Sequence, residues 1–228
     1  MANLAIIPAR GGSKRIPKKN IKEFLGKPII AYSIETALES QLFDEVMVST
    51  DDKEIADIAI KFGARIPFLR SKKNADDYAT TYDVIEEVLL AYKTKGKFYE
   101  SGCCIYPCAP LVSVENLNNS FIKLDVFDTV FPVVKYGYPI QRALKKGSND
   151  SLSFIKPVYT SSRSQDLETS YHDAGQFYWF KISEVLSSKS LMTKNTGCIV
   201  LPETQVQDID TETDWKLAEL KYRLLKNV

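Results

Sequence analysis

Short apolar segments alternate with amphipathic helical segments along the first half of the chain, and this alternation restricts the possible folds more than any other feature. Residues 3–8 and 45–49 are apolar runs of strand length, each followed by turn or capping residues. Between them, residues 28–40 carry apolar side chains at helical spacing and begin with a proline, which suits a first helical turn. The pattern predicts a strand, a crossover helix and a second strand.

The alternation continues to residue 134. We expect helices that begin at Asp51 or Asp52, at Thr80 or Thr81 and at Ser113, and buried strands at residues 102–106 and 128–134. Strands joined by helices run parallel with right-handed crossovers, which gives an α/β fold with a mainly parallel sheet and helices on both faces. A ligand then binds beyond the carboxyl ends of the strands.

The pattern loosens over residues 135–171, where Pro, Gly, Asn and a run of Thr and Ser interrupt short apolar pieces, so we expect an excursion from the sheet. Strands resume at residues 177–182 and 197–201, and a last helix begins at Thr211. Its expected apolar stripe consists of Trp215, Ala218, Tyr222 and Leu225. We expect residues 1–228 to form a single domain that carries the 135–171 excursion.

Charge and composition exclude several classes of protein. The chain of 228 residues has 30 Lys and Arg against 29 Asp and Glu, a net charge of +1, which argues against nucleic-acid and membrane-surface partners. No apolar run approaches the roughly 20 residues of a membrane helix, and the N-terminus does not resemble a signal peptide. Cys103, Cys104, Cys108 and Cys198 lack zinc-type spacing. Buried free thiols and a cytoplasmic location are expected.

A basic loop follows the first strand. Gly11 and Gly12 allow backbone amides to approach an anion, and Ser13 adds a hydroxyl donor. The five cations of the loop are Arg10, Lys14, Arg15, Lys18 and Lys19. Such a concentration in a nearly neutral chain points to a negative partner, of which a triphosphate is the natural example. We favour function for Arg10 and Lys19, whereas Arg15 and Lys18 could equally be solvated.

Two familiar nucleotide motifs are missing from the chain. It contains neither G-x-x-x-x-G-K-[ST] nor G-x-G-x-x-G, so ATP hydrolysis by a P-loop and hydride transfer with a dinucleotide are both disfavoured.

A pair of carboxylates precedes the last helix. Asp208 and Asp210 are separated by one residue, so in an extended segment they project to the same side and repel each other unless a cation lies between them. Mg²⁺ held by one or two carboxylates and substrate phosphates suits this arrangement. Alternatively, Asp210 or Thr211 is only a helix cap and Asp208 a surface residue. Combined with the basic loop, the pair favours nucleotidyl transfer.

Several segments resemble the CMP-sialic acid synthetase family, in order over nearly the whole chain. They are residues 7–20 (IPARGGSKRIPKKN), 48–51 (VSTD), 68–70 (FLR) and 207–212 (QDIDTE). Residues 136–144 (YGYPIQRAL), 163–167 (RSQDL) and 171–180 (YHDAGQFYWF) are similar to the branch of the family that activates pseudaminic acid.

This resemblance implies a Rossmann-like three-layer nucleotidyltransferase fold and a Mg²⁺-dependent reaction of CTP with a nine-carbon 2-keto sugar acid, giving a CMP-sugar and pyrophosphate. The implied catalytic residues are Arg10, Lys19, Asp208 and Asp210, with the two aspartates as metal ligands. The implied nucleotide-binding residues are Ala9, Arg10, Gly11, Gly12, Ser13, Lys14, Lys19, Asn20, Arg70, Thr80 and Thr81.

The resemblance also implies a sugar site and a homodimer. The implied sugar-binding residues are Tyr106, Gln141, Arg142, Arg163, His172, Asp173 and Gln176. In the family the excursion, here residues 135–171, is a dimerisation arm that reaches into the neighbour's site. Arg142 and Arg163 are candidates to pair with the sugar carboxylate.

The choice of sugar depends on departures from the family pattern. Residues 106–112 (YPCAPLV) and 172–175 (HDAG) stand where sialic acid synthetases have QPTSPLR and RPNG, which argues against sialic acid. Alternatives are the same reaction on sialic or legionaminic acid, and an inactive nucleotide-binding module. The retention of the four implied catalytic residues disfavours the last of these.

Overall fold

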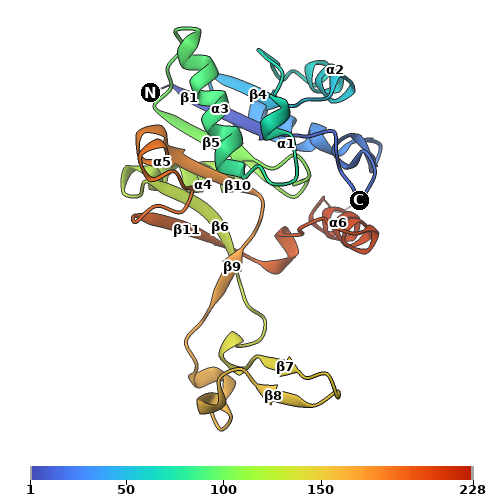
Figure 1. The fold of residues 1–228 in the computed structure, drawn as a ribbon, viewed down its shortest axis with the longest axis vertical. Helices are drawn as coiled ribbons and strands as arrows, with labels where there is room; N and C mark the ends of the chain where they lie inside the picture. Colours follow the sequence, from blue (N-terminus) through green and yellow to red (C-terminus); the bar gives the residue numbers. More distant parts are fainter. Residues whose placement is uncertain (1, 227–228) are drawn as a thin grey trace.

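A twisted sheet of seven strands forms the centre of the molecule (Figure 1). The computed structural model describes residues 2–226. The strand order is β11-β6-β10-β5-β1-β4, with β9 paired to β6. The strands are β1 (Asn3–Pro8), β4 (Glu45–Ser49), β5 (Ser101–Ile105), β6 (Thr129–Lys135), β9 (Tyr171–Asp173), β10 (Phe177–Lys181) and β11 (Thr196–Leu201).

Most of these strands are parallel. β1 runs parallel to β4 and β5, and β11 runs parallel to β6, whereas β10 is antiparallel to both of its neighbours and β9 is antiparallel to β6. The prediction of a mainly parallel sheet is therefore confirmed, and the carboxyl ends of β1, β4 and β5 meet at one edge.

Helices cover both faces of the sheet. One face packs against α1 (Ile29–Glu39), α2 (Lys53–Lys61) and α4 (Val114–Phe121), and the other against α3 (Thr81–Thr94) and α5 (Ile182–Ser188). Side chains alternate along β1, since Ala5 and Ile7 join the first core and Leu4 and Ile6 join the second. This burial on both faces explains why the strands are continuous apolar runs in the sequence.

Side-chain caps start the predicted helices close to where the sequence places them. Asp52 accepts hydrogen bonds from the backbone amides of Glu54 and Ile55 at the start of α2. Thr80 and Asp83 form a reciprocal capping box at the start of α3. Because these bonds depend on local sequence alone, they could be predicted.

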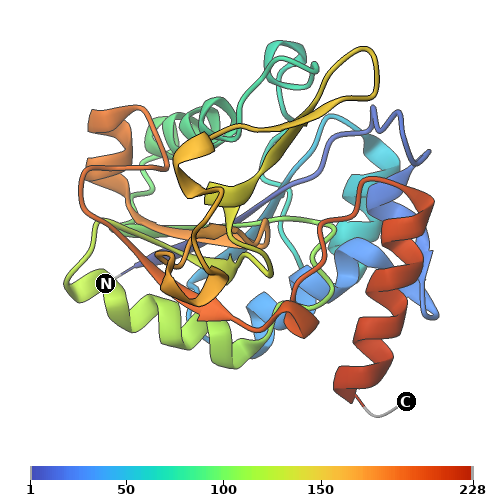
Figure 2. The same ribbon diagram turned by 90° about the horizontal axis from the view of Figure 1, so that it is seen from below.

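The last helix, α6 (Glu212–Lys226), packs on a small hairpin that the sequence did not predict, formed by β2 (Glu23–Phe24) and β3 (Lys27–Pro28). Trp215 and Ala218 are buried there, and Tyr222 packs against this cluster. Leu225 was expected in the same stripe, but it is 37% exposed because the last turn of α6 extends past the core (Figure 2).

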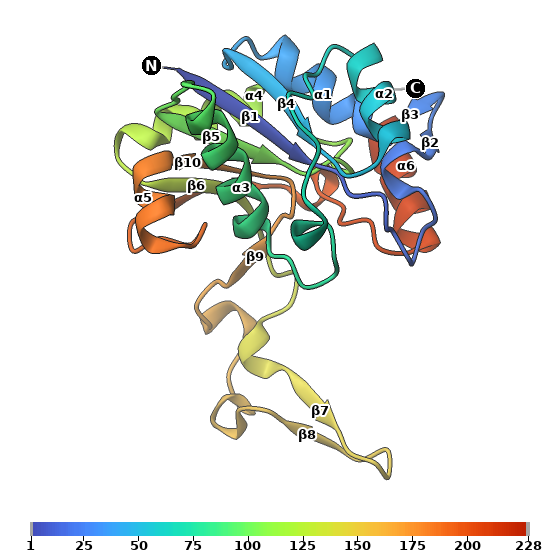
Figure 3. The ribbon, with the colours of Figure 1, turned by 45° about the horizontal axis from the view of Figure 1, so that its top comes forward.

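Between β6 and β9 the chain leaves the sheet as an arm, within residues 135–171, where the sequence predicts an excursion. β6 leads out and β9 leads back, and the arm carries a hairpin of β7 (Leu144–Lys146) and β8 (Leu152–Phe154) that projects away from the rest of the chain (Figure 3). Several apolar side chains of the arm are exposed, namely Leu144, Leu152, Ile155 and Val158.

The cysteines differ in burial according to their positions in the sheet. Cys103 and Cys104 are buried in β5 and Cys108 is partly buried, whereas Cys198 is exposed, so the expectation of a buried thiol is wrong at that position. Cys198 lies on β11, an edge strand that is only partly covered. Among residues 2–226, no helix combines the length and apolar character needed to cross a bilayer.

Candidate active site

A cavity of about 340 Å³ opens beyond the carboxyl ends of β1 and β5, where the topology of the sheet favours a ligand. Its lining includes most of the predicted nucleotide-binding side chains, namely Arg10, Ser13, Lys14, Lys19, Asn20, Arg70, Thr80 and Thr81. Tyr106 and Asp208 line it as well. The structure thus brings together residues that are up to about two hundred positions apart in the chain.

An apolar contact joins the basic loop to the carboxylate segment. Ile16 and Ile209 are each 1% exposed and share a cluster with Trp215. Burying side chains of this size contributes about 1.5–3 kcal/mol each. The loop and the segment before α6 are therefore anchored to each other by packing.

Polar contacts also join the basic loop to the segment before α6. Lys19 Nζ donates to the carbonyl oxygen of Ile209 at 2.7 Å and lies 3.7 Å from Asp210 Oδ1. Arg15 Nη2 lies 2.7 Å from the same carboxylate oxygen. Arg15, for which function and a solvated role were equally weighted, thus lies at the site, whereas Lys18 pairs with Glu54 on α2 instead.

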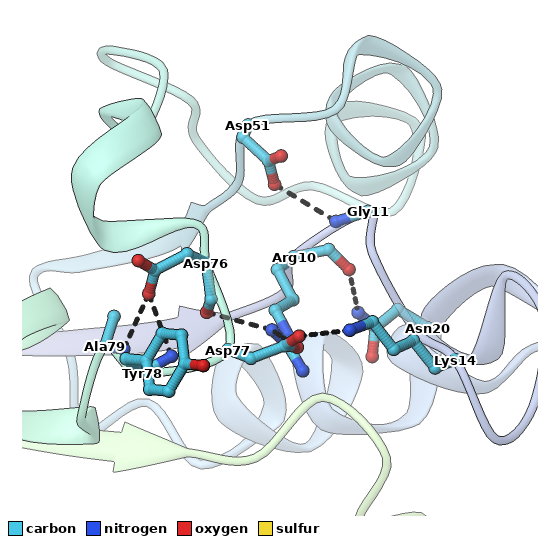
Figure 4. Close-up of polar contacts among 9 residues, drawn as sticks. All are labelled: Arg10, Gly11, Lys14, Asn20, Asp51, Asp76, Asp77, Tyr78 and Ala79. Carbon is cyan, nitrogen blue, oxygen red and sulfur yellow. Dashed lines mark hydrogen bonds and ion pairs between the residues drawn. The ribbon is translucent and has the colours of Figure 1, made fainter.

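A second carboxylate holds the other cations of the loop (Figure 4). Arg10 Nη1 donates to Asp77 Oδ1 at 2.6 Å and to the carbonyl oxygen of Asp76 at 2.9 Å, and Lys14 contacts the other oxygen of Asp77. Hydrogen bonds from Lys14 and Arg10 lower the pKa of Asp77. Sequence reasoning missed Asp76 and Asp77, although two adjacent acidic residues between the predicted contacts Arg70 and Thr80 were a usable signal.

Gly11 and Asn20 shape the loop. The backbone amide of Gly11 donates to Asp51 Oδ1 at 3.0 Å (Figure 4), and a Cβ at Gly11 would lie 2.7 Å from Asp52 Oδ2, so only glycine allows this close approach to α2. Asn20 Nδ2 donates to the carbonyl oxygen of Arg10 at 2.9 Å, and Cys108 Sγ donates to Asn20 Oδ1 at 3.2 Å. Ala9, Gly11 and Gly12 do not line the cavity.

Another part of the cavity wall is formed by Arg70, Thr81 and Tyr106. Arg70 is 7% exposed and its Nε donates to Ser49 Oγ at 3.0 Å, and burial lowers the pKa of its guanidinium. The hydroxyls of Thr81 and Tyr106 share a hydrogen bond of 3.2 Å. These side chains are held by β4, α3 and the end of β5, so this wall is built on regular elements.

Asp208 lines the cavity, whereas Asp210 does not line it and pairs with Arg15 and Lys19. Both offer carboxylate oxygens, which suit a hard cation. Burial, followed by the charge of Asp210, raises the pKa of Asp208, and a bound cation would relieve both effects. Within residues 2–226 no three His, Cys, Asp or Glu side chains cluster as a metal site. Mg²⁺ is commonly bound by only one or two protein carboxylates, and oxygens of the substrate phosphates complete its coordination. The residues present therefore fit Mg²⁺ with a nucleotide.

The predicted sugar-binding residues of the arm lie apart from the cavity of their own chain (Figure 1). Arg163 pairs with Asp166, with Nε and Oδ2 2.8 Å apart, and Gln141 Nε2 donates to the carbonyl oxygen of Glu168 at 2.8 Å. The guanidinium of Arg142 lies 6.0 Å from the ring of Tyr138. Because the arm projects from the sheet, a single chain does not bring these residues to Tyr106.

His172, Asp173 and Gln176 also do not line the cavity. The ring of His172 packs against Tyr136 at 5.0 Å, and Asp173 accepts a hydrogen bond from the Tyr178 hydroxyl at 2.7 Å. Gln176 is 2% exposed, and its Nε2 donates to the carbonyl oxygen of Gln205 at 2.6 Å. The structure thus gives Gln176 a core contact, and its sugar-binding role stays a prediction.

Comparison with known proteins shows the family. A sequence model described as cytidylyltransferase matches residues 4–175. The chain is 42% identical over 226 residues to a pseudaminic acid cytidylyltransferase of Campylobacter jejuni subsp. jejuni serotype O:2, covering 98% of this chain and 97% of that relative. It is 32% identical over 226 residues to a CMP-N,N'-diacetyllegionaminic acid synthase of Legionella pneumophila subsp. pneumophila, covering 96% and 95%. The chain therefore belongs to the cytidylyltransferase family and is a nucleotidyltransferase, as the sequence predicted.

Solved structures confirm the fold class. A CMP:2-keto-3-deoxy-manno-octonic acid synthetase complexed with CTP superposes with a TM-score of 0.68 at 16% identity, over 100% of both chains. A 4-diphosphocytidyl-2C-methyl-D-erythritol synthase from Anaerococcus prevotii gives a TM-score of 0.65 at 15% identity, over 97% of this chain and 98% of that one. At these identities the likeness concerns the fold alone, which is the predicted Rossmann-like nucleotidyltransferase fold.

Proposed function

We propose that this chain transfers CMP from CTP to pseudaminic acid in a Mg²⁺-dependent reaction, giving CMP-pseudaminic acid and pyrophosphate. The observation that carries the proposal is the cavity itself, which joins the basic loop to the Asp208 segment in a chain of the cytidylyltransferase family. The pseudaminic acid cytidylyltransferase of Campylobacter jejuni, 42% identical over nearly the full length of both chains, supports the choice of sugar.

The residues of the cavity suit this chemistry. The anomeric hydroxyl of the sugar attacks the α-phosphorus of CTP, and negative charge accumulates on the nonbridging oxygens and on the departing pyrophosphate. Arg10, Lys14 and Lys19 would bind the phosphates and stabilise this charge from fixed positions. Asp208 and Asp210 would hold Mg²⁺, which supplies further electrostatic stabilisation of the phosphate oxygens when it is bound.

In this proposal, a different part of the cavity wall selects the nucleotide. Arg70, Thr80 and Thr81 would contact the cytosine or the ribose. Arg70 is held by Ser49 on β4, and Thr80 and Thr81 are fixed at the start of α3, which favours a defined orientation of the base. Tyr106, held by Thr81, would face the sugar side of the cavity.

The arm completes the proposal at the level of the assembly. Its candidate sugar ligands Arg142 and Arg163 lie apart from the cavity of their own chain, and its apolar side chains are exposed. A second copy would explain both features, since its arm could bring these residues to the neighbouring cavity. We therefore propose that residues 135–171 form the dimerisation arm of a homodimer.

A substrate comparison tests the proposal. Pyrophosphate release would be measured with CTP, Mg²⁺ and purified pseudaminic, legionaminic, sialic or 2-keto-3-deoxy-manno-octonic acid. We expect the highest kcat/KM with pseudaminic acid. Equal or greater turnover of legionaminic or sialic acid would contradict the sugar assignment, and no pyrophosphate with any of the four acids would favour the inactive nucleotide-binding module.

A further inference from the structure

Asp77 carries a charge that the proposed reaction does not use. It lies in the loop between the 3-10 turn at Lys72–Asn74 and α3, and its two carboxylate oxygens contact two different cations, Arg10 and Lys14 (Figure 4). These are the side chains to which the proposed function assigns the phosphates of CTP. The same two cations therefore face a carboxylate in this structure and a triphosphate in the proposed complex.

We propose that Asp77 is an internal counter-anion that occupies the place of a nucleotide phosphate between Arg10 and Lys14 and competes with CTP for these cations. The inference rests on the proposed function, because it takes Arg10 and Lys14 as phosphate ligands. A carboxylate and a phosphate both offer two oxygens in a plane to neighbouring N–H donors, so one can replace the other without moving the cations far.

The contacts of Asp77 are of the kind that exchange readily. The side chains of Arg10, Lys14 and Asp77 are 36%, 78% and 41% exposed. Ion pairs at this exposure are weak, since water screens them and holding long side chains costs entropy. A triphosphate carries several negative charges and would replace the single carboxylate with a stronger partner.

Few other bonds hold the segment around Asp77. Asp76 Oδ1 accepts from the backbone amides of Tyr78 and Ala79, and these bonds lie within the turn itself. Beyond the turn, and among the described residues, Asp76 and Asp77 accept hydrogen bonds from Arg10 and Lys14. The carboxylate can therefore withdraw by rotation of its side chain or by movement of a short exposed turn.

The effect of removing Asp77 distinguishes a counter-anion from a structural contact. In the free enzyme Asp77 satisfies two cations that would otherwise repel each other, and on binding it must release both. Its removal should therefore strengthen the binding of a triphosphate, whereas removal of a residue that only orients Arg10 and Lys14 should weaken it.

The experiment compares Asp77→Asn with Asp76→Asn by calorimetric titration with inorganic tripolyphosphate, without Mg²⁺ or sugar. Both variants lose one negative charge, but Asp76→Asn retains a side-chain acceptor for the turn and leaves the contacts of Asp77 with Arg10 and Lys14 in place. We expect Asp77→Asn to bind about three- to tenfold more tightly than the wild type, from two exposed ion pairs that no longer compete. Asp76→Asn should show a clearly smaller gain. An equal gain in both variants, or weaker binding by Asp77→Asn, would overturn the inference.

Two further variants separate this inference from the proposed function. Arg10→Met should bind tripolyphosphate more weakly than the wild type if Arg10 is a phosphate ligand. If Arg10→Met binds as well as the wild type, the phosphate site of the proposed function fails and this inference fails with it. If Arg10→Met binds weakly and Asp77→Asn also binds weakly, only the counter-anion is refuted. Asp77→Ala, checked for folding by its unfolding temperature, repeats the test without the residual acceptor of asparagine.

Discussion

At the scale of single residues, Asp210 and Asp214 lie four positions apart but have different partners. Asp214 Oδ2 accepts from the backbone amide of Thr211 at 2.7 Å, and Thr211 Oγ1 accepts from the amide of Asp214, so these two residues cap α6. The carboxylate of Asp210 instead faces Arg15 and Lys19. The two carboxylates therefore have separate roles, although Asp214 Oδ2 also accepts a hydrogen bond from the backbone amide of Asp210 at 3.2 Å.

The two aspartates form a matched pair for mutation. Asp210→Ala should lower kcat about 10²–10³-fold, because one stabilising group at the developing charge is lost. Its unfolding temperature should change little. Asp214→Ala should lose about 0.5–2 kcal/mol of unfolding free energy with the helix cap and keep most of its kcat. Steady-state kinetics and thermal unfolding measure both, and wild-type kcat in Asp210→Ala at limiting Mg²⁺ would remove this residue from the metal site.

Glu45 gives a prediction on stability. Its side chain is 5% exposed and accepts hydrogen bonds from Lys97 Nζ at 2.8 Å, from the Tyr92 hydroxyl at 2.5 Å and from the Tyr99 hydroxyl at 3.1 Å. Burial acts to raise the pKa of Glu45, but the hydrogen bonds from Lys97, Tyr92 and Tyr99 outweigh it and the pKa is lowered.

The sign of the pH dependence follows from this lowered pKa. The stabilisation is complete above the unfolded pKa of about 4.3 and is lost as the pH falls through the lower folded value. Glu45→Gln should therefore cost about 1–3 kcal/mol of unfolding free energy at pH 7. In urea unfolding, this difference from the wild type should shrink as the pH falls below the unfolded pKa, and a difference that grows toward acid would contradict the account.

At the scale of elements, long periodic segments could be predicted and short ones could not. β1, β4 and β5 are buried on both faces, so their sequences are continuous apolar runs, and α2 and α3 begin at local caps. The β2–β3 hairpin has two residues in each strand and depends on packing against α6, which is distant in sequence. Apart from Gly26 in its two-residue turn, no local pattern indicates it.

The candidate site also has parts that could be predicted from the sequence and parts that could not. The basic loop and the Asp208 segment could be predicted, because each is a local concentration of charge. The contacts could not be predicted, because only the fold brings Asp77 to Arg10 and Asp210 to Lys19. The contact made by Gln176 could not be predicted either, because its burial depends on β10 and the segment before α6 together.

The segment before α6 is held in place by hydrogen bonds to its backbone carbonyl oxygens. The carbonyl oxygens of residues 205, 206 and 209 accept hydrogen bonds from Gln176, Lys221 and Lys19 respectively, from three different parts of the chain. These contacts fix the backbone on both sides of Asp208. We therefore expect Gln176 to act on the site by positioning this backbone.

Gln176→Met tests this arrangement, because methionine has a similar shape and no amide. We expect a loss of about 1–3 kcal/mol of unfolding free energy from the unpaired carbonyl. We also expect a fall in kcat with little change in KM for the sugar, because Asp208 is displaced. Lys221→Met, which removes the neighbouring carbonyl contact, should show a smaller effect in the same direction. A large rise in sugar KM with unchanged kcat would instead make Gln176 a direct sugar contact, as the family resemblance implied.

At the scale of the whole molecule, the body and the arm differ in how they are stabilised. The body has apolar cores on both faces of its sheet, whereas the β7–β8 hairpin exposes Leu144 and Leu152, and Val158 beyond it is 79% exposed. Exposed apolar groups gathered on one projecting segment favour a protein partner. A homodimer is the assembly that we propose for this arm.

Sedimentation velocity tests the homodimer. The wild type should sediment as a dimer at micromolar concentration, and the double variant Leu152→Asp, Val158→Asp should sediment as a monomer, because two charges would be buried at the interface. The double variant Ile60→Asp, Leu90→Asp, at exposed positions of the body, serves as the control and should remain dimeric. A monomeric wild type, or an arm variant that stays dimeric, would contradict the assignment of the arm.

The central claim is the chemistry of the cavity, and ³¹P NMR of the reaction mixture tests it most directly. With CTP, Mg²⁺ and pseudaminic acid, the account predicts that the three CTP resonances are replaced by one phosphodiester resonance of CMP-pseudaminic acid and one of pyrophosphate. Asp210→Ala should leave nearly all of the CTP unreacted in the time that the wild type needs to consume it, because its kcat is expected to be about 10²–10³-fold lower. Release of orthophosphate, or intact CTP with the wild-type enzyme, would contradict cytidylyl transfer to this sugar.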